Sequence, residues 1–259
     1  MSLFNPALMV RMCIPCRRLE GLAQLMKTGS PFPKACTLLP ITVMGRPSCP
    51  VVLQTAWCED GLGIRVEVSG KAKPVVGDAN SPLLADGVSL WLNTRGKASG
   101  KRAGAYCYLL HLLPTGGGNE RQNPVFLHGK IPRAQAEPHP VGTGQVFFHS
   151  CLTPDGYTVS LLIPQGALTG LDFSENRMLS LLVKIQDSER GPLLSCADIE
   201  VNYDEDPNWW DKLQLVDETP PPEKGSVTPQ KRQGPDDQAA DRPLRKRGRG
   251  AIRKAGEDG

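Results

Sequence analysis

The sequence predicts an all-β protein, an antiparallel β-sandwich of the jelly-roll type followed by a disordered C-terminal tail. Several short segments alternate between apolar and polar residues, which is the period of a strand with one buried face. The 259 residues include 27 Gly and 24 Pro, which favour a fold with many turns. No helical pattern of usable length occurs. We therefore expect a β-sandwich domain over residues 1–217 and a tail over residues 218–259.

The clearest strand signal covers residues 62–68, just after the turn signal Asp60-Gly61. Its residues alternate between an apolar face and a second face: Leu62, Ile64, Val66 and Val68 against Gly63, Arg65 and Glu67. Such strict alternation predicts an antiparallel strand that buries one face.

Other strands are expected on both sides of this one. Residues 8–18 alternate and predict an opening strand, whereas residues 29–50 are rich in Pro, Gly and Ser and predict an irregular connection. Further strands are expected at residues 88–93, 106–113, 145–152, 157–163, 178–186 and 212–216. The segment Pro154-Asp155-Gly156 predicts a hairpin, and residues 164–171 are expected to form one short helical turn.

The positive charge of the chain is concentrated in the tail. Residues 219–259 contain ten Lys or Arg and six Asp or Glu, so their net charge is +4. The net charge of the whole chain is +3, which leaves residues 1–218 with a net charge of −1. A nearly neutral domain does not indicate a basic nucleic-acid-binding surface. The tail is too poor in apolar residues to fold alone. Its residues 245–254 include six basic residues, which could bind nucleic acid through phosphates or simply keep the chain soluble.

The eight cysteines are expected to be mostly reduced thiols of a cytoplasmic protein. The first ten residues contain no Lys or Arg, and Arg11, Arg17 and Arg18 interrupt the apolar residues that follow, so no signal peptide is expected. No segment is long and apolar enough to predict a membrane span.

No motif of a catalytic or metal site is found. The spacing of Cys13 and Cys16 suits a metal or redox pair, but no second pair follows, and residues three apart in a strand face opposite sides. There is no nucleophile elbow, phosphate loop or dinucleotide fingerprint. We therefore expect a binding protein rather than an enzyme, with no catalytic or metal-binding residue assigned.

Several stretches resemble the family 9 carbohydrate-binding modules. The first half of the family pattern is similar to Asp60-Gly-Leu with its alternating strand and to Asp86-Gly-Val-Ser-Leu-Trp-Leu-Asn-Thr-Arg95. The second half is similar to Gly156-Tyr-Thr-Val-Ser-Leu-Leu-Ile-Pro164 and to Asp206-Pro-Asn-Trp-Trp210. The resemblance spans residues 9–216 and extends to uncharacterised bacterial proteins of the kind common in planctomycetes. It implies a β-sandwich related to the dopamine-monooxygenase-like superfamily.

The resemblance also implies a sugar held between two tryptophan rings. One ring matches Trp209 or Trp210, and since neighbours in a strand face opposite sides, at most one of them can line a site. The other ring belongs to the loop before Asp86, where residues 74–84 contain no aromatic residue. At two positions where the family has an acidic residue, this sequence has Ser89 and Ser160. The candidate ligand-binding residues are Trp209, Trp210, Trp91 and Arg95.

These observations leave several partners open. A saccharide is the first expectation, and a protein-interaction or scaffold domain that has lost sugar binding is the alternative. Nucleic acid is expected only at residues 245–254. No cofactor is expected apart from structural calcium, which the resemblance implies and which acidic loops favour. The acidic residues concerned are Asp198, Glu200, Asp204, Glu205 and Asp206, which otherwise form a solvated loop.

Overall fold

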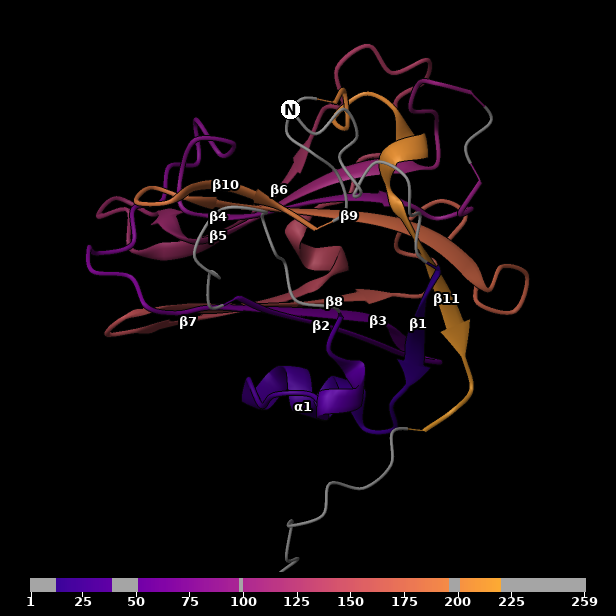
Figure 1. Ribbon diagram of the computed structural model, residues 1–259, viewed down its shortest axis with the longest axis horizontal. Helices are drawn as coiled ribbons and strands as arrows, with labels where there is room; N and C mark the ends of the chain where they lie inside the picture. The colour runs from indigo at the N-terminus through magenta and orange to yellow at the C-terminus, as the bar shows by residue number, and fades with distance from the viewer. Residues whose placement is uncertain (1–12, 39–50, 98–99, 196–200, 220–259) are drawn as a thin grey trace, which may run out of the picture. The chain divides into compact units, whose positions relative to one another are not determined.

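Hydrogen bonds join eleven strands of the described part of the chain into one sheet that folds over into two packed layers (Figure 1). The computed structural model describes residues 13–38, 51–97, 100–195 and 201–219. The strands are β1 (Cys13–Arg18), β2 (Val51–Cys58), β3 (Gly61–Val68), β4 (Gly87–Asn93), β5 (Cys107–Gly117), β6 (Asn123–Gly129), β7 (Phe147–Thr153), β8 (Gly156–Pro164), β9 (Met178–Asp187), β10 (Gly191–Leu194) and β11 (Asp211–Val216). The predicted β-sandwich is confirmed.

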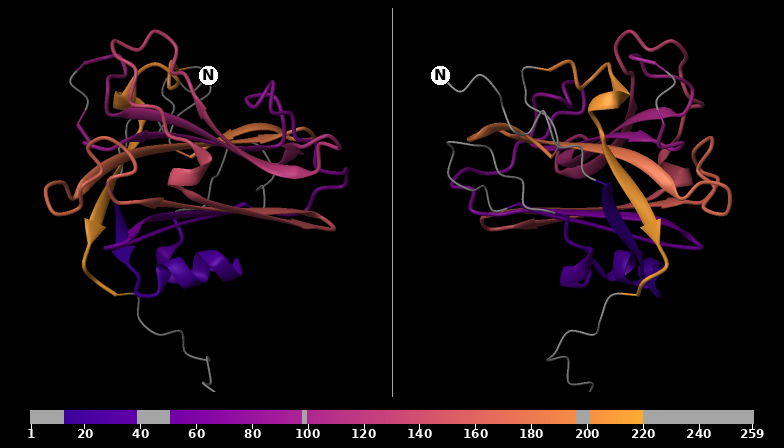
Figure 2. Two further views of the ribbon diagram at one scale, coloured as in Figure 1. Left: turned by 180° about the vertical axis from the view of Figure 1, so that it is seen from behind. Right: turned by 45° about the vertical axis from the view of Figure 1, so that its right-hand side comes forward.

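The strand order is β6-β5-β4-β9-β11-β1-β2-β3-β8-β7, with β10 paired to β9. We call β6, β5, β4, β9 and β10 the upper sheet and β2, β3, β8 and β7 the lower sheet, as they lie in Figure 1. Strands β11 and β1 run side by side between the two, which Figure 2 shows from two other directions. The pairing is antiparallel except that β1 is parallel to both β11 and β2.

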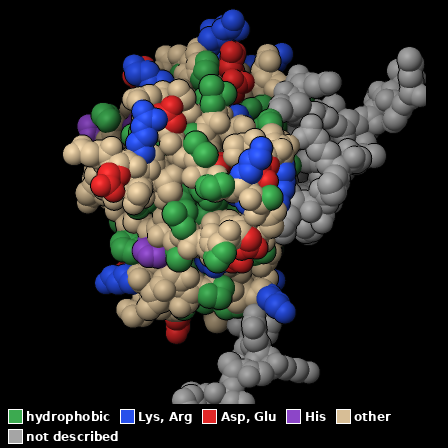
Figure 3. Space-filling model, turned by 90° about the vertical axis from the view of Figure 1, so that its left-hand side faces the viewer, with side chains coloured by type: hydrophobic (Ala, Val, Ile, Leu, Met, Phe, Trp, Pro, Cys, Tyr) green, Lys and Arg blue, Asp and Glu red, His purple; other side chains and the backbone are tan. Residues whose placement is uncertain are grey.

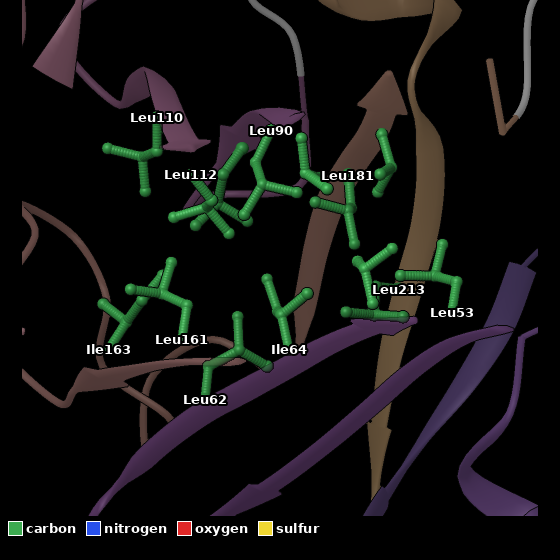
Figure 4. Close-up of a cluster of buried hydrophobic side chains, with 14 of the residues drawn as sticks. Leu53, Leu62, Ile64, Leu90, Leu110, Leu112, Leu161, Ile163, Leu181 and Leu213 are labelled. Atoms are coloured by element: carbon green, nitrogen blue, oxygen red, sulfur yellow. The ribbon is translucent and has the colours of Figure 1, made fainter. Parts of the chain in front are cut away.

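The main core fills the space between the two sheets. Apolar side chains from both layers point toward one another there, as Figure 4 shows for Leu90 and Leu112 of the upper sheet and Leu62, Ile64 and Leu161 of the lower one. All five are completely buried. Burying one such side chain contributes about 1.5–3 kcal/mol, so the inward halves of the alternating strands supply most of the hydrophobic stabilisation.

The outer face of the lower sheet is covered by the short helix α1 (Leu22–Thr28), which lies below it in Figure 1. Leu22 and Met26 are buried against the sheet. A Cβ added to Gly63 would lie 2.8 Å from Cδ1 of Leu22, so the glycine allows this close packing. The second face of residues 62–68 is therefore largely buried as well, and Arg65 with it. The prediction that one face alone of this strand is buried was wrong, because helix α1, which was not predicted, covers the other face.

Most predicted strands are confirmed, namely those at residues 62–68, 88–93, 106–113, 145–152, 157–163, 178–186 and 212–216. Of the opening strand at residues 8–18, the described part is β1, and the predicted hairpin joins β7 to β8. Strands β2, β6 and β10 were not predicted. Residues 164–171 form two turns rather than a helical turn, because Gly166 and Gly170 have φ values of +81° and +80°.

The predicted tail at residues 218–259 lies outside the described residues apart from Glu218 and Thr219, and so does its basic run at residues 245–254. The structure also includes three short 3₁₀ turns, at Lys34–Cys36, Thr143–Gln145 and Pro207–Trp209. Among the described residues, no helix has the length and apolar character needed to cross a membrane.

Candidate functional site

Three of the four predicted site residues meet on the outer face of the upper sheet. Trp91 alternates with the core residues of β4, so it points away from the lower sheet and lies buried against Tyr203, with ring centroids 5.6 Å apart in an edge-to-face arrangement. Trp210 is also buried, and its indole Nε1 donates to the carbonyl of Tyr203 at 2.8 Å. Trp209 is half-buried and packs against the buried hydrophobic group that includes Trp91 and Trp210. We call Trp91, Tyr203, Trp209 and Trp210 the aromatic cluster.

A 3₁₀ turn positions the two adjacent tryptophans. The carboxylate of Asp206 accepts the backbone N–H of Asn208 at 2.9 Å, and Pro207 begins the turn. Trp209 therefore ends a turn and Trp210 leads into β11, so the two are not neighbours in one strand as predicted. The outcome is nonetheless that Trp210 packs inside while Trp209 keeps part of its surface exposed.

A row of polar side chains crosses three strands beside this cluster. Ser89 of β4 is paired with His111 of β5 on one side and with Lys184 of β9 on the other. The Oγ of Ser89 lies 2.9 Å from Nδ1 of His111. Burial, together with the charges of Lys184 and His128, lowers the pKa of His111 to about 4, so its ring is neutral at neutral pH. We call Lys184, Ser89 and His111 the polar row.

Two loops from distant parts of the chain approach Lys184. Its Nζ donates to the carbonyl of Leu83, which belongs to the segment between β3 and β4, at 3.4 Å. Burial lowers the pKa of Lys184, and the negative charge of Asp204, in the segment before β11, opposes that shift. The polar row therefore lies where the β3–β4 segment and the segment before β11 come together.

The β3–β4 segment carries exposed aliphatic side chains at the position where the resemblance places an aromatic ring. Val76 is 59% exposed, Leu83 38% and Leu84 78%. Figure 1 shows this segment rising past the edge of the upper sheet to its outer side. Figure 3 views the molecule from the left-hand side of Figure 1 and shows hydrophobic side chains scattered there among acidic and basic ones.

A buried charge centre anchors the β3–β4 segment to the end of β9. The ammonium of Lys71 lies 3.2 Å from Asp86 and 3.1 Å from Asp187, and it also pairs with Glu189 at 3.4 Å. Asp86 in turn accepts the backbone N–H of Val76 at 2.8 Å. This network fixes the path of the segment that carries Leu83.

Arg95, the fourth predicted site residue, lies beyond the end of β4. Its guanidinium carbon lies 5.2 Å from the centre of the Tyr106 ring, and its Nη1 pairs with Glu175 at 3.4 Å. These contacts lie beyond the C-terminal end of β4, whereas Ser89 lies near the N-terminal end of that strand. The structure thus brings Trp91, Trp209 and Trp210 together, whereas Arg95 belongs to a separate surface group.

The acidic residues near the closing turn have individual roles in the structure. Asp206 caps the 3₁₀ turn, Glu205 pairs with Arg133 at 3.5 Å, and Asp204 acts on Lys184. Asp198 and Glu200 lie outside the described residues. Within the described ranges, no three His, Cys, Asp or Glu side chains are grouped to hold a metal ion. Structural calcium stays a prediction.

The thiols of Cys13 and Cys16 point to opposite sides of β1, as the strand period requires. Cys13 is exposed and Cys16 buried, and burial raises the pKa of Cys16 to about 12. The six cysteines in the described ranges are all free thiols.

Several residues of this face were not candidates from the sequence, namely Tyr203, Lys184, His111 and Leu83. One signal was present. In the strand at residues 178–186, Lys184 alternates with Val183 and Ile185, so it falls on the face opposite to the core. The sequence does not show that Ser89 and His111 lie beside it, because strand register depends on pairing between distant segments.

No family model matches the sequence, and no curated protein matches it. Solved structures are similar in fold. A family 9 carbohydrate-binding module from Caldicellulosiruptor kristjanssonii in complex with glucose matches over 82% of this chain and 100% of its own, with a TM-score of 0.52 and 15% identity. The structure of such a module from the same organism in complex with cellotriose matches over 84% and 98%, with a TM-score of 0.51 and 14% identity.

A third similar structure is a candidate carbohydrate-binding protein from Bacteroides uniformis. It matches over 80% of this chain and 100% of its own, with a TM-score of 0.50 and 11% identity. At such low identity the likeness concerns the fold. The chain therefore has a fold like that of the family 9 carbohydrate-binding modules.

Proposed function

We propose that this chain is a non-catalytic carbohydrate-binding module whose ligand lies on the outer face of the upper sheet. The observation that carries the proposal is the position of the aromatic cluster beside the polar row. Trp91 and Ser89 are two residues apart on β4 and so share one face. Sugar recognition needs this combination, because the C–H face of a sugar packs on aromatic rings while its hydroxyl groups need convergent polar partners.

The fold supports the same function. The similar structures from Caldicellulosiruptor kristjanssonii are carbohydrate-binding modules in complex with glucose and cellotriose. Within this chain, Trp209 is the tryptophan of the aromatic cluster that keeps exposed surface, and it packs against the buried group that includes Trp91 and Trp210. We therefore assign Trp209 the role of the platform ring.

Calorimetry with glucose, cellotriose and the hits of a glycan array tests this proposal. We expect binding by the full chain and a loss of about tenfold or more in affinity for Trp209→Ala, which corresponds to about 1.4 kcal/mol. Leu152→Ala is the matched control, because Leu152 is 51% exposed on β7 of the lower sheet. The proposal fails if the folded protein binds no saccharide at millimolar concentration, or if Trp209→Ala binds as the wild type does.

A protein-interaction domain is the second candidate function, and the exposed aliphatic side chains of Val76, Leu83 and Leu84 favour it. Exposed apolar groups close together in one segment are a feature of protein-binding surfaces. Under this alternative, Leu84→Asp should remove a protein partner recovered by affinity purification of the wild type, and saccharide binding should be absent. Retention of the partner by Leu84→Asp would reject it.

A further inference from the structure

Two hydrogen-bond donors near the polar row lack a good acceptor. The indole Nε1 of Trp91 is buried and has no hydrogen-bond partner. The Nζ of Lys184 has one weak bond, to the Leu83 carbonyl at 3.4 Å. A lysine ammonium and an indole N–H can only donate. A ligand that completes this face must therefore supply acceptors.

The charge of Lys184 is also left without a close partner. Among the ion pairs of the described residues within 4.0 Å, none includes Lys184. Asp204 is near enough to act on Lys184 electrostatically but forms no such pair. The other charged or titratable neighbour in the row, His111, is neutral at neutral pH. The row thus presents a partly desolvated positive charge, and burying such a charge costs free energy until an anion pairs with it.

The composition of the β3–β4 segment beside Lys184 also favours a ligand with a negatively charged group. Leu83 is aliphatic, and residues 74–84 of this segment contain no aromatic ring. A neutral sugar would therefore lack a second ring to pack against. A charged group on the sugar supplies binding energy at that side, because a hydrogen bond between an ammonium and a carboxylate is about twice as strong as one between neutral groups.

From these groups we infer that the ligand is an acidic saccharide, a uronic acid or a chain ending in one, whose carboxylate pairs with Lys184. This inference rests on the proposed function and narrows its ligand class. The carboxylate accepts from Nζ of Lys184, and the sugar ring lies toward Trp209. The carboxylate of Asp204 is left to accept from sugar hydroxyl groups.

Paired calorimetric titrations with glucuronate and glucose test the inference on the full chain. We expect glucuronate to bind about tenfold or more tightly than glucose at low salt. This preference should shrink between about 0.05 M and about 0.5 M NaCl, because salt screens a partly exposed ion pair. Lys184→Met, which keeps the aliphatic stem, should abolish the preference, so that glucuronate and glucose bind with similar affinity, and Lys184→Arg should retain it.

Lys130→Met is the matched control, because the Lys130 side chain is 82% exposed and pairs with Glu137 on the surface. It should keep the full preference, and thermal unfolding should show that each variant is folded. Equal binding of glucuronate and glucose, or a preference that survives in Lys184→Met, would overturn the inference and leave the proposed function standing. Failure of the folded wild type to bind any saccharide would reject both.

Discussion

The Nζ of Lys71 lies 3.1 Å from Oδ1 of Asp187, and each of these side chains is only 1% exposed. Lys71 also pairs with the buried Asp86 and with the partly exposed Glu189, so one ammonium holds three carboxylates together. The contacts join the β3–β4 segment to the end of β9 and to the turn that follows it. The position of Leu83 beside the polar row therefore depends on this charge centre.

Removing the ammonium should destabilise the protein strongly. In Lys71→Met the buried carboxylates of Asp86 and Asp187 lose their counter-charge, and breaking a buried pair in this way costs about 3–5 kcal/mol. Urea unfolding measures the change. Lys130→Met removes a surface pair instead, which should cost about 1 kcal/mol or less. Equal stability losses in the two variants would show that the buried centre is not a stabilising element.

Stability should fall in acid because of Asp187. Burial opposes ionisation of this carboxyl, but the N–H groups of Glu189 and Arg190 and the ammonium of Lys71 outweigh it and hold its pKa below the ordinary 3.8. A carboxyl with a lowered pKa stabilises the folded state above pH 3.8 and loses this contribution as pH falls through the folded pKa. Urea midpoints measured from pH 6 down to about pH 2 should show the loss. In Asp187→Asn the decline should be shallower, and an unchanged slope would contradict the assignment.

Stability should also fall in strong base. Burial lowers the pKa of Lys71, but Asp187 and Asp86 outweigh it and raise the pKa above the ordinary 10.5. A lysine with a raised pKa contributes its full stabilisation below pH 10.5 and loses it as pH rises through the folded pKa. The urea midpoint should thus decline above that pH. Lys71→Met should lack this alkaline decline relative to its own value at pH 8, and a matching decline in both proteins would exclude Lys71 as its source.

Helix α1 should stabilise the lower sheet through Leu22. This side chain is fully buried over Gly63, so Leu22→Ala leaves a cavity and should lower the free energy of unfolding by about 2–5 kcal/mol. Gln24→Ala, at an exposed position of the same helix, should change it by about 0.5 kcal/mol or less. Thermal unfolding of the two variants decides the matter. A small effect of Leu22→Ala would mean that the helix is not packed as described.

An aromatic ring in place of Leu83 should strengthen the binding of neutral sugars. Leu83 is 38% exposed and its carbonyl accepts from Lys184 of the polar row, so a tryptophan there can pack against a sugar bound beside that row. We expect Leu83→Trp to raise glucose affinity by about tenfold, which is about 1.4 kcal/mol. The control is Leu152→Trp on the lower sheet, which should leave the affinity unchanged. Calorimetry that shows no gain for Leu83→Trp would place the sugar elsewhere.

The strands that the sequence predicted are those with strict alternation, as in residues 62–68. Strand β2 was missed because seven of its eight residues are buried, with apolar groups on both faces and no alternation to recognise. Strand β6 contains Pro124 and lies at the end of the strand order, where a proline is tolerated. Helix α1 has seven residues, too few for a clear helical period, and is held by its packing.

The candidate site was only partly predictable for a related reason. The tryptophans carry their own chemical signal, and the structure gathers Trp91, Trp209 and Trp210 into one cluster. Lys184 and His111 could not be recognised as site residues from the sequence, because only the strand register places them on either side of Ser89. Registers of this kind are set by tertiary pairing, which local sequence patterns do not contain.

The central claim, a saccharide bound on the outer face of the upper sheet, is tested most directly by the indole N–H signals in NMR spectra. The four tryptophans give four such signals, and Trp57 is an internal control because its Nε1 donates to the carbonyl of Val216 away from this face. On titration with glucuronate, glucose and cellotriose, the signals of Trp209 and Trp91 should shift while that of Trp57 stays in place. Spectra of the folded protein in which no indole signal moves, or only that of Trp57, would contradict the claim.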